Sequence, residues 1–158
     1  MSNAKTIENL QKAMKMEMTA AHQYQLHAHV LDDWGLDLLA AKMREEMQEE
    51  LGHADKFIER ILFLEGTPEI DFHKKPKKSE SLLEMFKADV ADEEEAINFY
   101  TLAAKQAYEE NDIGTRALFE ELVLDEEGHK EWLDQQISLI DRLGEQTFSA
   151  KQMSGPEA

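Results

Sequence analysis

Residues 39–64 read LAAKMREEMQEELGHADKFIERILFL, and this segment gives the strongest indication of the fold. One face of the corresponding helix carries residues at three- and four-residue spacing, namely Leu39, Met43, Glu46, Glu50, His53, Phe57, Ile61 and Leu64. That spacing is typical of long helices that pack in a bundle. Glu46, Glu50 and His53 interrupt this mainly apolar face, although burying an unpaired charge is costly. The stretch therefore predicts a core-facing helix that also carries a functional site.

Three further long helices are predicted on the same grounds, because the chain has only 7 Gly and 3 Pro to interrupt them. Ser81 and Glu84 fit a capping box that opens the third helix, with Leu83 on its core stripe, and Gly66 ends the second. The fold class is therefore all-α: a four-helix bundle with one long crossover loop and a short fifth C-terminal helix. The expected helices span about residues 4–31, 36–65, 80–108, 113–143 and 145–153, in one domain covering residues 1–158.

The composition narrows the range of partners. Lys and Arg number 17 against 34 Asp and Glu, a net charge of −17 that disfavours nucleic acids and anionic membranes and favours metal cations. The chain has no Cys, which excludes disulfide scaffolds, zinc fingers and iron–sulfur clusters. No apolar run reaches the length of a membrane span and no signal segment is evident, so we expect a cytoplasmic protein.

The two halves of the chain repeat with an offset of 76 residues, as from Glu17 to Glu93. The other equivalent pairs include Tyr24 with Tyr100, Glu50 with Glu126, and His53 with His129. Each half thus carries one core Glu and one Glu-x-x-His pair, whose members project from the same helix face. Four carboxylates and two imidazoles on facing helices are a known ligand set for two iron or manganese ions, with zinc as a competitor. The sequence predicts a dinuclear metal centre.

At these residues the chain resembles the bacterioferritins, within the ferritin-like superfamily. The resemblance covers about residues 5–145 and is carried by Tyr24, by DDWG at 32–35, ELGHAD at 50–55, IERILFLEG at 58–66 and DEEGH at 125–129. It implies a ferritin-like bundle that assembles into a hollow 24-subunit shell for iron storage. It also implies a ferroxidase activity that oxidises Fe(II) with O₂ or H₂O₂.

The resemblance further implies roles for individual residues. It implies a di-iron centre with terminal ligands Glu17, His53, Glu93 and His129 and bridging ligands Glu50 and Glu126. Tyr24 matches a tyrosine near the centre that can supply an electron.

Two positions depart from the bacterioferritin pattern. Leu51 stands where the family has the methionine that binds haem between paired subunits, so we expect no haem b. Glu45 and Glu49 replace the His and Asp of an iron site on the inner surface of the shell, and Glu46 lies on the adjacent core stripe. These three carboxylates are the candidates for an inner-surface iron site.

Other functions stay open on sequence grounds. The main alternative is a rubrerythrin-like di-iron peroxidase of low oligomeric state, although that class usually carries a cysteine-rich module. A twelve-subunit, DNA-protecting miniature ferritin and a metal-free structural bundle are further alternatives. The sequence leaves open the oxidant, whether the iron pair is a stable cofactor or a transit site, and whether a second bacterioferritin subunit type co-assembles.

Overall fold

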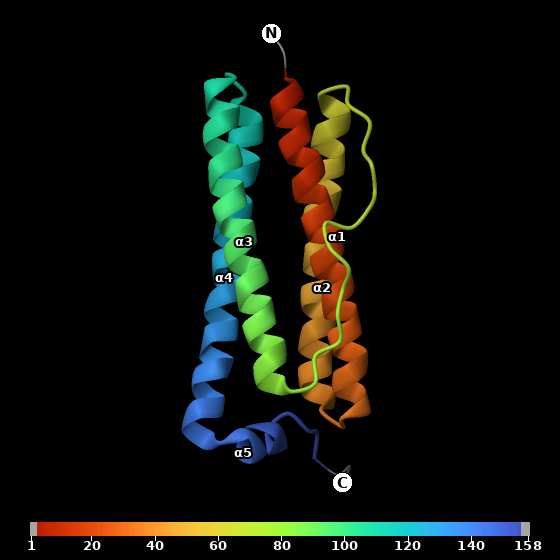
Figure 1. Ribbon diagram of the computed structural model, residues 1–158, viewed down its shortest axis with the longest axis vertical. Helices are drawn as coiled ribbons and strands as arrows, with labels where there is room; N and C mark the ends of the chain where they lie inside the picture. Colours follow the sequence, from red (N-terminus) through yellow and green to blue (C-terminus); the bar gives the residue numbers. More distant parts are fainter. Residues whose placement is uncertain (1–2, 156–158) are drawn as a thin grey trace.

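The chain folds into a bundle of four long helices with a short fifth helix across one end (Figure 1). A computed structural model describes residues 3–155, so residues 1, 2 and 156–158 of the predicted domain lie outside the described part. None of the helices in the described part is long and apolar enough to cross a membrane. The all-α fold is confirmed, with helices α1 (Ala4–Asp33), α2 (Asp37–Phe63), α3 (Leu82–Glu109), α4 (Ile113–Leu143) and α5 (Glu145–Ala150).

The four long helices form two antiparallel pairs, in which α1 packs against α2 and α3 packs against α4. Residues 64–81 contain no helix and run from one end of the bundle to the other alongside α1 (Figure 1). This segment is the predicted crossover, and we call it the crossover loop. Because it returns to the end where α2 began, α2 and α3 run in the same direction.

The start of α3 differs in detail from the prediction. The helix begins at Leu82 rather than at residue 80, and the Ser81 hydroxyl accepts a hydrogen bond from the Glu84 N–H at 3.1 Å. The Glu84 carboxylate accepts from the N–H of Glu80, one residue outside the expected capping box. Leu83 is 36% exposed, so its predicted place in the core is wrong, and Leu82 is buried instead. Leu82 lies four residues before Phe86, on the buried stripe that continues through Met85 and Asp89.

The end of α2 also corrects the prediction. The helix stops at Phe63 rather than at residue 65, and Glu65 rather than Gly66 takes the left-handed conformation, with φ of 65°. Gly66 donates its N–H to the Ile61 carbonyl at 2.9 Å, as in a Schellman motif. A Cβ on Gly66 would come within 3.1 Å of the Ile7 side chain. Glycine therefore allows α1 and the end of α2 to approach closely without displacing the side chains of Ile7 and Ile61.

Two apolar clusters divide the core along the bundle axis. One lies toward α5 and includes Leu31, Leu39, Met43, Phe86 and Phe148. The other lies toward the opposite end and includes Leu10, Phe57, Tyr100, Phe119 and Leu122. Phe148 anchors α5 through an edge contact with Phe86, with ring centroids 6.0 Å apart. The buried polar residues between the two clusters form the candidate site.

Candidate metal centre

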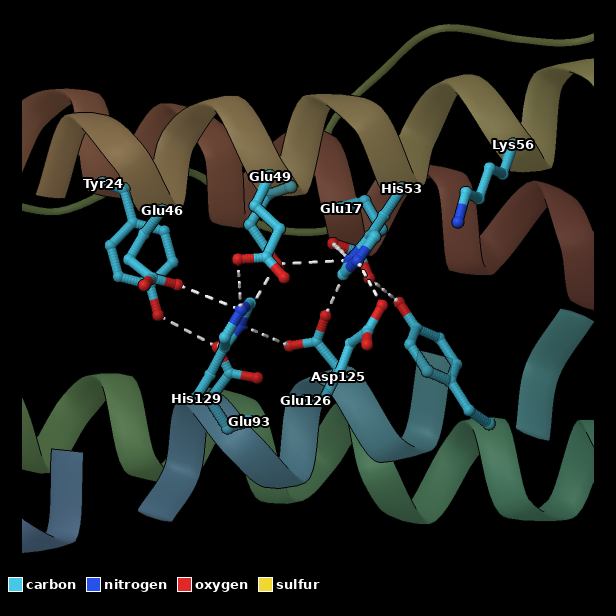
Figure 2. A network of polar contacts seen from close by, with 12 residues as sticks. Glu17, Tyr24, Glu46, Glu49, His53, Lys56, Glu93, Asp125, Glu126 and His129 are labelled. Atoms are coloured by element: carbon cyan, nitrogen blue, oxygen red, sulfur yellow. Dashed lines mark hydrogen bonds and ion pairs between the residues drawn. The ribbon is translucent and has the colours of Figure 1, made fainter. Parts of the chain in front are cut away.

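All four long helices contribute buried polar side chains to the middle of the bundle (Figure 2). Each lies on the core-facing stripe of its helix, and none is more than 8% exposed. They are Glu17 from α1, Glu50 and His53 from α2, Glu93 from α3, and Glu126 and His129 from α4. The structure therefore brings together all six residues that the sequence singles out as metal ligands.

The two imidazoles face the same carboxylates from opposite sides. The Nδ1 atom of His53 lies 3.0 Å from Glu126, 3.3 Å from Glu50 and 3.6 Å from Glu17. The Nδ1 atom of His129 lies 3.3 Å from both Glu50 and Glu126 and 3.6 Å from Glu93. Glu50 and Glu126 are thus common to two four-residue groups whose ligand atoms lie within 4.8 Å of one another. This geometry suits two metal ions with two shared carboxylates.

Several atoms of this group are buried without a hydrogen-bond partner among residues 3–155. They are Oε2 of Glu17, Oε1 of Glu50, Oε2 of Glu93, and both Nδ1 and Nε2 of His129. Orphaned buried polar atoms are destabilising, and a bound cation would satisfy them. Four carboxylates would also balance the charge of two divalent ions, so the donor set fits a pair of hard or borderline cations.

Burial shifts the pKa values of this group. It raises the pKa of Glu50 to about 8 and that of Glu126 to about 7, and it raises the pKa of Glu93. Burial also acts to raise the pKa of Glu17, but contacts with His53 outweigh it and the pKa of Glu17 is lowered. In the metal-free protein, some of the carboxyl groups therefore hold protons near neutral pH. A cation would have to displace them.

Two tyrosines hold the terminal carboxylates in a crossed arrangement. The Tyr24 hydroxyl of α1 donates to Oε1 of Glu93 at 2.9 Å. The Tyr100 hydroxyl of α3 donates to Oε1 of Glu17 at 2.6 Å. Tyr24 is the tyrosine expected near the centre. Tyr100 was not predicted as a site residue, although the offset of 76 residues relates it to Tyr24.

The outer nitrogen of each imidazole meets a further carboxylate. Asp125 lies 3.1 Å from Nε2 of His53, and Glu49 lies 2.9 Å from Nε2 of His129. Asp125 is the equivalent of Glu49 under the same offset, but it was not predicted as a site residue. The hydrogen bond with Asp125 helps to orient the His53 ring so that its Nδ1 faces the centre, whereas Nε2 of His129 lies close to Glu49 without making a hydrogen bond within residues 3–155.

The candidates for an inner-surface iron site divide into two sets. Glu46 is buried and lies 3.1 Å from Nε2 of His129, so it joins Glu49 and His129 in a further group that could hold a cation. Glu45 is not brought to this group, because its side chain is 74% exposed and pairs at 3.9 Å with Lys42.

Comparison with known proteins gives a consistent result. Residues 7–143 match the model of the ferritin-like domain family. The chain is 46% identical to the bacterioferritin of Rhodobacter capsulatus, over 93% of this chain and 91% of that protein. It is 38% identical to the bacterioferritin of Brucella melitensis, over 91% of this chain and 89% of that protein. The chain belongs to the bacterioferritin family.

Solved bacterioferritin structures share the fold in full. The bacterioferritin of Rhodobacter capsulatus matches with a TM-score of 0.95 and 43% identity, over 99% of this chain and 98% of that chain. Its structure is described with a metal-free dinuclear site and a haem iron. The bacterioferritin BfrA of Mycobacterium tuberculosis matches with a TM-score of 0.94 and 34% identity over 98% of this chain and 97% of that one. The described residues therefore have the fold of the solved bacterioferritins.

Proposed function

We propose that this bacterioferritin stores iron and that its buried centre is a ferroxidase site. The observation that carries the proposal is the pair of four-residue groups that share Glu50 and Glu126. In this assignment Glu17 and His53 are the terminal ligands on one side, and Glu93 and His129 are those on the other. Fe(II) is the substrate, and it supplies the electrons that reduce O₂ or H₂O₂.

The protein's own residues prepare the site for two cations. Glu50 and Glu126 release their bound protons as cations arrive, because each carboxyl pKa is raised by burial in the metal-free protein. The crossed hydrogen bonds from Tyr24 and Tyr100 leave one oxygen of each terminal carboxylate free to turn toward a metal. The apolar clusters at both ends of the bundle exclude bulk water from the site.

The storage part of the proposal requires a closed shell of 24 chains, as expected from the family. The net charge of −17 per chain far exceeds what the centre itself needs, and an acidic shell would attract Fe(II). Whether one or two subunit types build the shell is a separate question for the native assembly.

We propose further that this chain does not bind haem b in the usual bacterioferritin manner. Leu51 has no lone pair with which to ligate iron. Met47, one helical turn earlier, packs against the core cluster near α5 and is not free to replace it. Expression with ample haem should give no stoichiometric Soret band, whereas Leu51→Met should gain one. A bis-methionine haem spectrum in the wild-type protein would contradict this assignment.

The main experiment measures iron and native mass together. Purified metal-free protein should bind two Fe(II) per chain anaerobically, oxidise them rapidly when O₂ or H₂O₂ is added, and retain the product in a particle with the mass of 24 chains. A dimer that oxidises Fe(II) with peroxide but retains no iron would favour the rubrerythrin-like alternative. Absence of Fe(II) binding would overturn the ferroxidase proposal itself.

A further inference from the structure

A small cavity of about 30 Å³ reaches the candidate centre from the side where α1 faces α3. Such a volume holds one or two particles the size of water. Its inner wall is formed by the proposed ligands Glu17, Glu50, Glu93 and Glu126. Its lining also contains His73 and Lys74 from the crossover loop, together with Asp92 and Glu95 from α3. The crossover loop thus contributes charged side chains to a route toward the centre.

The backbone of the crossover loop is fixed at this point by α1. Thr19 is 5% exposed, and its hydroxyl accepts hydrogen bonds from the N–H of His73 at 2.8 Å and of Lys74 at 3.3 Å. The N–H of Lys77 is held in the same way by the Gln23 side chain at 2.9 Å. The backbone of the loop is therefore held at several points, and His73 and Lys74 are among the residues that line the cavity.

Those two side chains pair with the acidic residues of α3. His73 lies 2.9 Å from Glu95, and Lys74 pairs with Asp92 and lies 3.9 Å from Glu95. The side chains of His73 and Lys74 are 30% and 50% exposed, and those of Asp92 and Glu95 are 32% and 45% exposed. Ion pairs this exposed are weak and are screened by salt, so other cations can compete with them.

We propose that His73 and Lys74 form a displaceable cover over this cavity, which divalent cations open by taking their place at Asp92 and Glu95. Two carboxylates balance the charge of one divalent cation, so a hydrated Fe(II) ion can replace the lysine and the imidazole as their partner. The ion then lies next to Glu93, since that residue follows Asp92 in the chain and lines the same cavity. This inference rests on the proposed ferroxidase function, and it concerns how the substrate arrives.

The test compares two lysines of the crossover loop. Lys74→Gln removes the competing charge, so the KM for Fe(II) should fall severalfold while the maximum oxidation rate stays the same. Lys78→Gln is the matched control, because Lys78 belongs to the same loop but pairs with Glu80 at 3.5 Å and does not line the cavity. Glu95→Gln should act in the opposite direction and raise the KM, because it removes a carboxylate that the cation would use.

A second measurement does not depend on oxidation. Binding of Co(II) to the metal-free protein, followed by its visible absorption, should be faster in Lys74→Gln than in Lys78→Gln, with two ions per chain at saturation in both. Equal rates in the two variants, or a higher KM in Lys74→Gln, would overturn the cover while leaving the ferroxidase proposal intact. If wild-type protein binds no Co(II) or Fe(II), the ferroxidase proposal fails, and the cover fails with it.

Discussion

The α1–α2 half and the α3–α4 half of the bundle place the same side chains around the centre, yet the two ends of the centre differ. Glu17, Tyr24, Glu50 and His53 in the first half have identical residues 76 positions later. Beyond the ligands the match breaks down. Buried Glu46 corresponds to Leu122, buried His27 corresponds to Ala103, and buried Asp89 of the second half corresponds to Ala13 of the first.

These exchanges make one end of the centre polar and the other apolar. At the end near Tyr24, His27 and Asp89 form a buried hydrogen-bonded pair with Nε2 and Oδ1 2.8 Å apart. At the end near Tyr100, the rings of Phe57 and Phe119 lie 5.6 Å and 5.7 Å from the tyrosine ring. The ligands are thus the same in both halves, whereas the side chains around them are polar at one end of the centre and apolar at the other. The predictions below probe each side of this comparison.

The largest effect on the oxidation rate is expected from substitutions of the ligands that the two halves share. His53→Ala and His129→Ala should each slow the fast phase of Fe(II) oxidation by about 100-fold or more, because each removes one ligand of the pair. Stopped-flow absorbance gives the rates, and His29→Ala is the control because this histidine is exposed. A fast phase that survives in either ligand variant would show that the centre does not work as a symmetric pair.

The buried pair of His27 and Asp89 should contribute strongly to the free energy of unfolding. Asp89→Ala leaves the His27 imidazole buried without its partner and should lower the free energy of unfolding by about 3 kcal/mol. The double variant His27→Ala/Asp89→Ala reproduces the alanines of the other end, and it should cost clearly less than the sum of the two single variants. Chemical denaturation of all four proteins measures the coupling. If the two single variants lose amounts of unfolding free energy that add up to the loss in the double variant, His27 and Asp89 do not stabilise the fold through each other.

The metal-free protein should become less stable as the pH rises from 5.5 to 8. Burial raises the carboxyl pKa of Glu50 to about 8 and of Glu126 to about 7, so the folded state holds protons that the unfolded chain has released above pH 4.5. Neighbouring carboxylates outweigh burial and raise the pKa of His53 and His129, so their stabilising contribution is also lost only as the pH rises. The lowered pKa of Glu17 affects the pH dependence of stability only below pH 5.5.

We therefore expect the Tm of the metal-free protein to fall on the order of 5 °C between pH 5.5 and pH 8. Calorimetry on Glu50→Gln/Glu126→Gln, in which the two carboxyls cannot ionise, should show a flatter dependence. A wild-type Tm that rises across this interval would contradict the assigned direction of the shifts.

The smallest effect should separate the two tyrosines. Tyr24→Phe and Tyr100→Phe each remove one hydrogen bond to a terminal carboxylate, so each should cost about 1–2 kcal/mol of stability. Only Tyr24→Phe should slow repeated turnover, by a few-fold, if Tyr24 supplies an electron from its polar surroundings. Equal turnover in the two variants would remove the functional difference between the ends.

Most of the centre could be predicted from the sequence because helical periodicity decides which residues share a face. Glu50 and His53 lie three residues apart on an apolar stripe, and the repeat places their equivalents on another. Tyr100 and Asp125 could have been found by applying the same offset to Tyr24 and Glu49. The partnership of His27 with Asp89 could not, because 62 residues separate them and each looks ordinary on its own helix.

The helices, the duplicated ligands and the acidic balance could all be predicted from the sequence, because they follow from local spacing and composition. Only the tertiary structure decided which imidazole nitrogen faces which carboxylate, and that His73 and Lys74 come to lie beside the acidic residues of α3. The physical reason is that periodicity orients side chains about one helix axis. The relative rotation of neighbouring helices and the path of the crossover loop come from packing across the whole bundle.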